Sequence, residues 1–190
     1  MRRLCLGLAL LAIALSGCAV PVELGARHAP TCKTEGITGG SPLILMAQAV
    51  PTASFLPCIE LLPTGWRYEN ALEIRSGRAS FALASDRAGP RAVEVLLTAD
   101  CDIGQGTAVP SEELGMRRYE LVQAVRGGYE GARFYRFDGG CVVYQFHLGG
   151  EGRAVVVNEA SLALGFVSRS RLDVELRDRT GLRLNPPPTR

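Results

Sequence analysis

Few residues in this 190-residue chain combine the side-chain types and the spacing that catalysis requires. His147 is one of two histidines and lies on an expected strand, where its imidazole could act as a general base. Asp100, Asp102 or Asp138 would then supply the carboxylates of a hydrolase site. However, the signatures of serine hydrolases, zinc proteases, P-loop enzymes and S-x-x-K acyl-transfer enzymes are absent after residue 17. We therefore assign no catalytic residue, and a cell-envelope hydrolase that uses His147 with nearby carboxylates is the alternative.

The acidic residues and cysteines do not match a metal site. Asp100–Gly104 with Glu112 and Glu113 resembles part of a calcium loop, because a hard cation needs several carboxylate oxygens on one turn. In that loop the glycine comes one position early and the twelfth residue is Ser111. A zinc site would need closely spaced ligand pairs, and no C-x2-C or H-x3-H pair is present. We expect no metal and no cofactor.

A cluster of arginines and tyrosines is the best candidate for a binding surface. Arg118, Tyr119, Arg133 and Tyr135 lie on expected neighbouring strands, so their side chains could form one surface. Such a surface suits acidic glycans, lipid head groups or a partner protein. The alternative is a pair of solvated strand edges, on which the arginine stems cover apolar surface.

The composition indicates a globular protein and argues against a nucleic-acid partner. Hydrophobic residues make up 47% of the chain, which excludes a disordered chain. The formal net charge is +2 and aromatic residues make up 6%, so there is neither a basic stripe nor a stacking platform for bases.

The N-terminus has the pattern of a secretory signal peptide. Met1-Arg2-Arg3 precedes an apolar run over residues 4–15, and residues 1–17 form the expected signal. At about 1.5 Å per residue this run would be roughly 18 Å long as a helix, which is too short to span a hydrocarbon core of about 30 Å.

The end of this segment, Leu15-Ser16-Gly17-Cys18, resembles the lipobox of bacterial lipoproteins. The resemblance implies cleavage before Cys18, a diacylglycerol thioether on its sulfur, and acylation of the new amino group with a fatty acid such as palmitate. The mature chain resembles the uncharacterised lipoproteins of high-GC bacteria, and that likeness implies no activity. The expected location is extracytoplasmic, lipid-anchored to the outer face of the cell membrane or to the periplasmic side of an envelope membrane. The alternative is a secreted protein in which Cys18 is incidental.

Four cysteines remain when Cys5 leaves with the signal and Cys18 takes lipid. An even number outside the cytoplasm predicts two disulfides, and the four residues allow three pairings. We favour Cys32 with Cys58 and Cys101 with Cys141, because the last two both fall at the ends of expected strands. The candidate disulfide residues are Cys32, Cys58, Cys101 and Cys141.

The rest of the chain divides into a tether, one domain and a short tail. Residues 18–42 hold the lipidated cysteine and a tether rich in Gly, Pro and Thr. Residues 43–185 form a single expected domain, and residues 186–190 form a Pro-rich tail.

Alternation of apolar and polar residues predicts about five antiparallel strands in this domain. The expected ranges are 79–85, 92–101, 117–125, 132–137 and 141–148. From Asn158 the spacing becomes helical, with Leu162 and Phe166 and then Leu172 and Leu176 four residues apart. Gly165 and Ser168 indicate a bend or break between two helices. For the second helix, Ser170 with Asp173 resembles a capping box, and Gly181 follows its expected end. The expected fold class is therefore α+β, an antiparallel sheet with two short C-terminal helices packed on one face.

Together these observations predict a membrane-anchored extracytoplasmic lipoprotein that acts as a non-catalytic binding or interaction module. Its partners would be the membrane, through the lipid anchor, and an envelope protein, glycan or lipid that the sequence does not specify.

Overall fold

The computed structural model describes residues 28–125, 128–149 and 153–187. Within these ranges there are nine strands and three helices. The helices are α1 (Pro42–Ala49), α2 (Arg153–Ala163) and α3 (Arg169–Thr180). The strands are β1 (Phe55–Ile59), β2 (Trp66–Arg75), β3 (Arg78–Ser85), β4 (Gly89–Thr98), β5 (Thr107–Val109), β6 (Arg117–Val125), β7 (Gly128–Phe137), β8 (Gly140–Gly149) and β9 (Leu164–Ser168).

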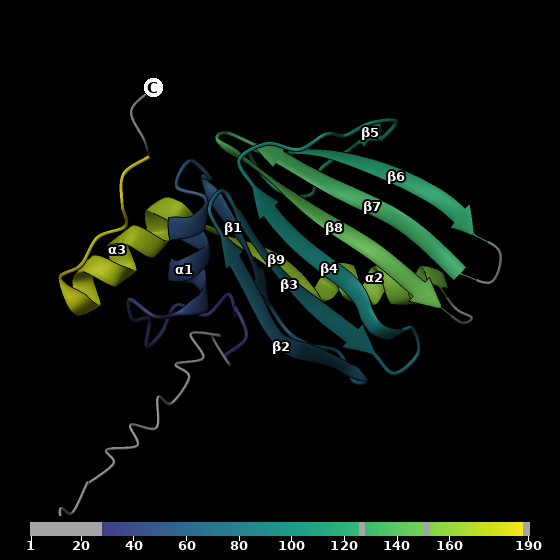
Figure 1. The fold of residues 1–190 in the computed structure, drawn as a ribbon, viewed down its shortest axis with the longest axis horizontal. Coiled ribbons are helices and arrows are strands. Elements are labelled where there is room, and N and C mark those ends of the chain that lie inside the picture. Colours follow the sequence, from purple (N-terminus) through teal and green to yellow (C-terminus); the bar gives the residue numbers. More distant parts are fainter. Residues whose placement is uncertain (1–27, 126–127, 150–152, 188–190) are drawn as a thin grey trace, which may run out of the picture.

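Seven of these strands form one antiparallel sheet in the order β2-β3-β4-β8-β7-β6-β5. The other two, β1 and β9, form a small antiparallel sheet of their own. Figure 1 shows α2 running behind β4 and β8, while α1 and α3 lie side by side at one end of the molecule. The expected β3–β4 hairpin and the three strands that follow it are confirmed.

The expected α+β class is wrong, because the molecule is mainly β and its large sheet has seven strands where about five were expected. Of the two expected C-terminal helices only α2 packs on that sheet, with Val156 and Ala160 in the main core. The other expected C-terminal helix, α3, packs on β9 instead. Its Arg169 donates a hydrogen bond to the Ala47 carbonyl of α1 at 2.7 Å.

The segment around Phe166 accounts for part of the difference between the expected fold class and the observed one. The four-residue spacing of Leu162 and Phe166 suggested one helix, but α2 ends at Ala163 and the chain continues as β9. In β9, Gly165 pairs with Cys58, and a Cβ atom at Gly165 would lie 2.5 Å from Glu60 Oε1. A side chain at this position would have to displace the Glu60 side chain, a contact that periodicity cannot reveal.

The helix α3 lies where it was expected, but its N-cap is a different residue from the expected one. Ser168, which was expected to mark a break, is the N-cap, and its side chain accepts a hydrogen bond from the backbone N–H of Arg171. Asp173, expected to close a capping box with Ser170, instead accepts a hydrogen bond from the Leu184 N–H at 2.8 Å. Gly181 ends the helix with φ of 75°, as its position after the last apolar residue indicated.

The two faces of the large sheet differ in size and in covering. The inner face bears the main core, including Val93, Val95, Tyr144 and Phe146. The outer face carries a small cluster of Phe134, Cys141 and Val143 with partly buried neighbours. Alternate residues of β8 belong to opposite faces, as the sequence pattern predicted.

Both favoured disulfide pairings are confirmed. Cys32 is bonded to Cys58 and Cys101 to Cys141. The first bond holds residues 28–41, the described part of the expected tether, against the domain, where Ile37 is buried and Thr31 bridges to Ile59. Cys18 and the signal segment lie outside the described residues. None of the described helices is both long enough and apolar enough to cross a membrane.

Loss of the Cys101–Cys141 bond should destabilise the domain measurably. The bond joins residues 40 positions apart, so breaking it restores conformational entropy to the unfolded chain. We expect the double variant Cys101→Ala/Cys141→Ala to lower the free energy of unfolding by about 2–4 kcal/mol in urea titrations. The Cys32→Ala/Cys58→Ala variant breaks a bond between residues only 26 positions apart, so its free energy of unfolding should fall by slightly less. A loss below about 1 kcal/mol for the first variant would contradict this.

Candidate functional site

The register of β6, β7 and β8 gathers polar side chains on the inner face of the sheet. Arg118 pairs with Tyr135, Glu120 pairs with Arg133, and Arg133 in turn pairs with Tyr144. Because side chains directly opposite each other in antiparallel strands share a face, all five point to the same side. Three of these residues, Arg118, Arg133 and Tyr135, were predicted from the sequence to lie on one surface, and the structure brings them together.

The fourth expected residue of that surface, Tyr119, lies on the opposite face. It pairs with Phe134 and packs on the outer cluster with Cys141 and Val143. Arg118 and Tyr119 are consecutive residues of one strand, so the pleat separates them. The surface expected from sequence is therefore divided between two faces of the sheet.

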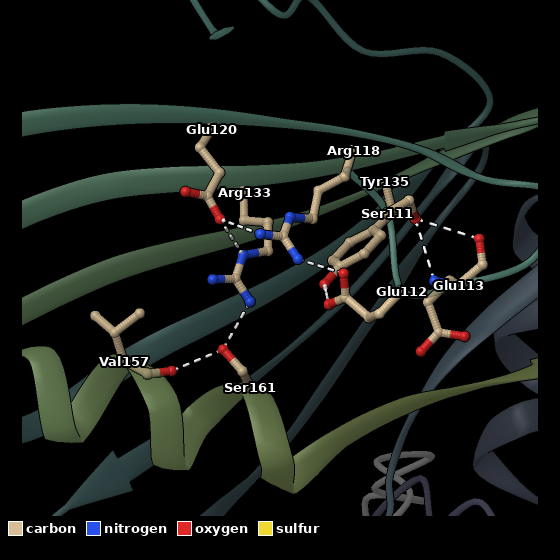
Figure 2. Close-up of polar contacts among 9 residues, drawn as sticks. All are labelled: Ser111, Glu112, Glu113, Arg118, Glu120, Arg133, Tyr135, Val157 and Ser161. Carbon is tan, nitrogen blue, oxygen red and sulfur yellow. Dashed lines mark hydrogen bonds and ion pairs between the residues drawn. The ribbon is translucent and has the colours of Figure 1, made fainter. Parts of the chain in front are cut away.

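Figure 2 shows a continuous ladder of charged groups on the inner face. Arg133 Nε donates a hydrogen bond to Glu120 Oε1 at 2.9 Å, and Arg118 Nη2 lies 3.2 Å from the same oxygen. Arg118 also forms an ion pair with Glu112 through Nη1. The Tyr135 hydroxyl donates to Glu112 Oε1 at 2.7 Å. Each carboxylate of the ladder thus receives two donors, which fixes its orientation.

The ladder is fastened to α2 by one side chain. Arg133 Nη1 donates a hydrogen bond to Ser161 Oγ at 2.7 Å, and Ser161 Oγ donates to the Val157 carbonyl at 2.7 Å (Figure 2). Only 12% of the Arg133 side chain is exposed, so its charge is largely removed from water and depends on these partners. Arg133 therefore ties the helix to the sheet.

A cavity of about 410 Å³ lies between this ladder and α2. We call it the α2 cavity. Its lining residues are Glu112, Glu113, Arg118, Arg133, Tyr135, Tyr144, Ala154, Val157, Asn158, Ser161, Leu162, Leu164 and Phe166.

Three aromatic rings form one side of the α2 cavity. The ring of Phe166 lies 5.0 Å from that of Tyr135 in a T-shaped arrangement, and is stacked on Tyr144 at 6.2 Å between centroids. Phe166 comes from β9, so the small sheet completes a site whose charged part belongs to the large sheet. The cavity therefore combines an apolar side with fixed hydrogen-bonding groups, as small-molecule sites commonly do.

Two neighbouring glutamates in this cavity have opposite pKa shifts. Burial acts to raise the pKa of Glu112, but its backbone hydrogen bond and the donors Tyr135 and Arg118 outweigh burial and lower it. Burial raises the pKa of Glu113, and the nearby carboxylates of Glu112 and Glu60 raise it further. Glu113 forms no ion pair within the described residues. The cavity thus holds one carboxylate whose charge is not compensated locally.

Two buried polar atoms at the cavity have no hydrogen-bond partner among the described residues. They are the Tyr144 hydroxyl and Arg118 Nε. Tyr144 is 1% exposed, and burial raises its pKa well above the ordinary value, so the phenol stays protonated. A buried polar group without a partner costs free energy, and such groups concentrate where a ligand or water supplies the missing partner.

The residues of the alternative hydrolase site do not converge. His147 is exposed on the outer face and pairs with Glu130. Asp138 lies in the turn at the other end of β8, about 20 Å away along the strand at roughly 3.3 Å per residue. Asp100 forms an ion pair with Arg136 at that same far end. A site combining His147 with these carboxylates is therefore absent from the described part of the chain.

In the loop that imitates a calcium site, the aspartate carboxylates accept hydrogen bonds from the backbone of the loop itself. Asp100 Oδ1 accepts a hydrogen bond from the Cys101 N–H at 2.9 Å, and Asp102 Oδ1 accepts one from the Gly104 N–H at 2.8 Å. Across residues 28–125, 128–149 and 153–187, no group of three or more His, Cys, Asp or Glu side chains is arranged to hold a metal ion.

Sequence reasoning missed Glu112, Glu120, Tyr144, Ser161 and Phe166 as members of the site. Glu120 could have been found, because Arg118 and Glu120 alternate on one strand. Tyr144 could not, since only the register of β7 and β8 brings it beside Arg133. Phe166 was expected on a helix and reaches the cavity because it belongs to β9.

Comparisons with known proteins assign no family to this chain. No family model matches it, and no curated protein matches it. A crystal structure of a protein from Bacteroides thetaiotaomicron VPI-5482 is similar at 12% sequence identity, with a TM-score of 0.33. The likeness covers 63% of this chain and 50% of that one, so it spans half of that chain. Likeness at this level carries no argument about function.

Glutamine variants of the two neighbouring glutamates should change stability in opposite directions. The pKa of Glu112 is lowered on folding, so its contribution is present above the unfolded pKa of about 4.3 and is lost as pH falls. The pKa of Glu113 is raised on folding, so its ionised form destabilises the fold at neutral pH and this cost disappears in acid. At about pH 7, Glu112→Gln should lose about 1 kcal/mol and Glu113→Gln should gain up to about 1 kcal/mol.

The measurement is urea unfolding of both variants between about pH 7 and pH 3. The Glu113→Gln difference from the unmodified protein should shrink as pH falls through the raised pKa of Glu113, whereas the Glu112→Gln difference should persist to about pH 4 and shrink only below it. Glu130→Gln is the matched control, because Glu130 is an exposed carboxylate on β7 beside His147. If both cavity variants moved in the same direction at neutral pH, the opposite roles of the two carboxylates would be refuted.

Proposed function

We propose that this protein is a lipid-anchored, extracytoplasmic, non-catalytic binding module whose ligand occupies the α2 cavity. One observation carries the proposal. The cavity is lined by charged groups that the protein holds in fixed positions, beside a fully buried Tyr144 hydroxyl that has no partner among the described residues. Fixed polar groups beside an apolar wall are what a specific small-molecule site requires.

The contacts of the ladder support binding over catalysis. Both Glu112 and Glu120 accept from arginine, and Glu112 also accepts from Tyr135, so neither is positioned to take a proton from a substrate. Tyr135 is likewise committed as a donor, and burial raises its pKa. Among the described residues that line this cavity, Ser161 is the only serine, cysteine or lysine, and its hydroxyl is hydrogen-bonded to Arg133 and to the Val157 carbonyl rather than to a base (Figure 2).

The cellular address rests on the lipobox and on the two disulfides. Disulfides persist in oxidising compartments, so Cys32–Cys58 and Cys101–Cys141 agree with an extracytoplasmic location. The anchor itself depends on Cys18, because the Leu15-Ser16-Gly17-Cys18 pattern resembles the lipoprotein signal. Attached acyl chains would hold the domain on a membrane surface without a spanning helix.

Replacement of Cys18 should release the protein from membranes or block its processing. We expect the unmodified protein, extracted from membranes, to have an intact mass that begins at Cys18 and includes acyl chains. Reduction should add about four protons, as two disulfides require. Cys18→Ala should lose the acyl mass and leave the membrane fraction. Normal processing and unchanged membrane retention of Cys18→Ala would refute the anchor.

A cavity-filling variant should abolish ligand binding if the α2 cavity is the site. Ala154 lines the cavity from an exposed position on α2, so tryptophan there would fill the space without replacing a core residue. We expect compounds from a panel of small sugars, amines, acids and lipid head groups to bind the unmodified protein and to bind Ala154→Trp at least about tenfold more weakly. Binding would be followed by calorimetry or amide chemical shifts.

Ala108→Trp is the matched control for this experiment. Ala108 is exposed on β5 and pairs with Tyr119, which belongs to the outer face. This variant should bind the panel as the unmodified protein does. If no compound in the panel bound, or if Ala154→Trp bound as well as Ala108→Trp, the α2 cavity would not be the ligand site.

A further inference from the structure

One carboxylate that lines the α2 cavity, that of Glu113, has no ion-pair partner among the described residues. Arg118 and Arg133 are engaged by Glu112 and Glu120, which leaves the Glu113 carboxylate without a cation of its own. Glu113 is half-buried, and the exposed carboxylate of Glu60 lies near enough to raise its pKa further. A negative charge that is partly removed from water and faces other carboxylates is unfavourable until a cation reaches it.

A second, independent observation points to a ligand at the same place. Tyr144 lines the cavity, and its hydroxyl is buried and has no partner among the described residues. Glu113 and Tyr144 are close enough that the carboxylate contributes to the raised pKa of the phenol, after burial and Tyr135. A phenol oxygen can accept a hydrogen bond from a ligand that also donates to a carboxylate.

Resting on the proposed function, we infer that the ligand of the α2 cavity carries an ammonium group. This group binds between the Glu113 carboxylate and the Tyr144 hydroxyl, and it donates a hydrogen bond to each. The rings of Tyr135 and Phe166 lie on the same side of the cavity and contribute cation–π attraction. The chemical class is therefore a small aliphatic amine, or a larger molecule that presents a primary amine.

The charges favour a cation over the other ligand classes. An anion entering the cavity meets the carboxylates of Glu112 and Glu113, while both arginines are already paired with carboxylates. A neutral ligand leaves the charge of the Glu113 carboxylate uncompensated. An ammonium group compensates the Glu113 charge and donates hydrogen bonds that the Glu113 carboxylate and the Tyr144 oxygen can accept.

The test compares three probes of the same chain length and different charge: n-butylammonium, n-butanol and butyrate. Each is titrated into the isolated full-length protein at constant salt near pH 7, and binding is followed by the amide chemical shifts of α2, β7 and β8. We expect n-butylammonium to bind at least about tenfold more tightly than n-butanol, and butyrate to bind weakest.

Glu113→Gln should remove this preference, so that n-butylammonium binds no more tightly than n-butanol. Glu113→Asp keeps the charge and should retain the preference in part. Glu130→Gln, on the outer face, should bind as the unmodified protein does. The amide spectrum of each variant outside the cavity reports whether the fold is retained.

Acid should weaken n-butylammonium binding in the unmodified protein. As pH falls through the raised pKa of Glu113, the carboxyl becomes neutral and the attraction is lost. In Glu113→Gln this dependence should be absent over the same range. The titratable and charged groups that face Glu113 are Glu60, Glu112, Arg118, Arg133, Tyr135 and Tyr144.

Failure of this inference can be told apart from failure of the proposed function. Equal or tighter binding of n-butanol or butyrate, or an unchanged preference in Glu113→Gln, overturns the ammonium assignment. Such binding still supports the α2 cavity as the ligand site if Ala154→Trp abolishes it. If none of the three probes binds, the ammonium assignment falls, and the proposed function is then decided by the broader panel with Ala154→Trp.

Discussion

The inner face of the seven-stranded sheet is a wide apolar surface that the rest of the molecule has to cover. At about 4.8 Å between strands the sheet is roughly 29 Å across, whereas the eleven residues of α2 extend about 17 Å. One helix therefore cannot cover the whole face. The β1-β9 sheet and α1 extend the covering, and the main core includes residues from all of them. The α2 cavity lies beside β6 and β7, where this covering ends.

The change of side chains along the inner face follows from this incomplete covering. On β4 and β8 the face is apolar, with Val93, Val95 and Phe146 buried. On β6 and β7 the same face carries Arg118, Glu120 and Arg133, and both arginines line the cavity. Charged groups at half-buried positions need partners, and the ladder supplies them within the sheet. The bond from Arg133 to Ser161 then fixes where α2 lies, so that the covering of the core and the shape of the cavity depend on one another.

The two disulfides act at separate places on this frame. Cys101–Cys141 joins the loop after β4 to the start of β8 and belongs to the small outer cluster. Cys32–Cys58 joins the N-terminal segment to β1, which pairs with β9 and so borders Phe166 in the cavity. A chain of covalent and hydrogen-bonded contacts thus connects the segment nearest the proposed anchor with the strand that completes the proposed site.

The sequence by itself determined the features that depend on neighbouring residues. Alternation gave the strands on either side of the 86–90 and 138–140 turns, Gly181 gave the end of α3, and the strand-end positions of Cys101 and Cys141 gave their pairing. Tertiary structure alone decided which faces meet. The β6–β7–β8 register placed Tyr144 beside Arg133 and sent Tyr119 to the other side, and the close approach of β1 made residues 164–168 a strand. Local periodicity reports which residues of one element share a face, but the partner of that face is chosen by packing between segments far apart in the chain.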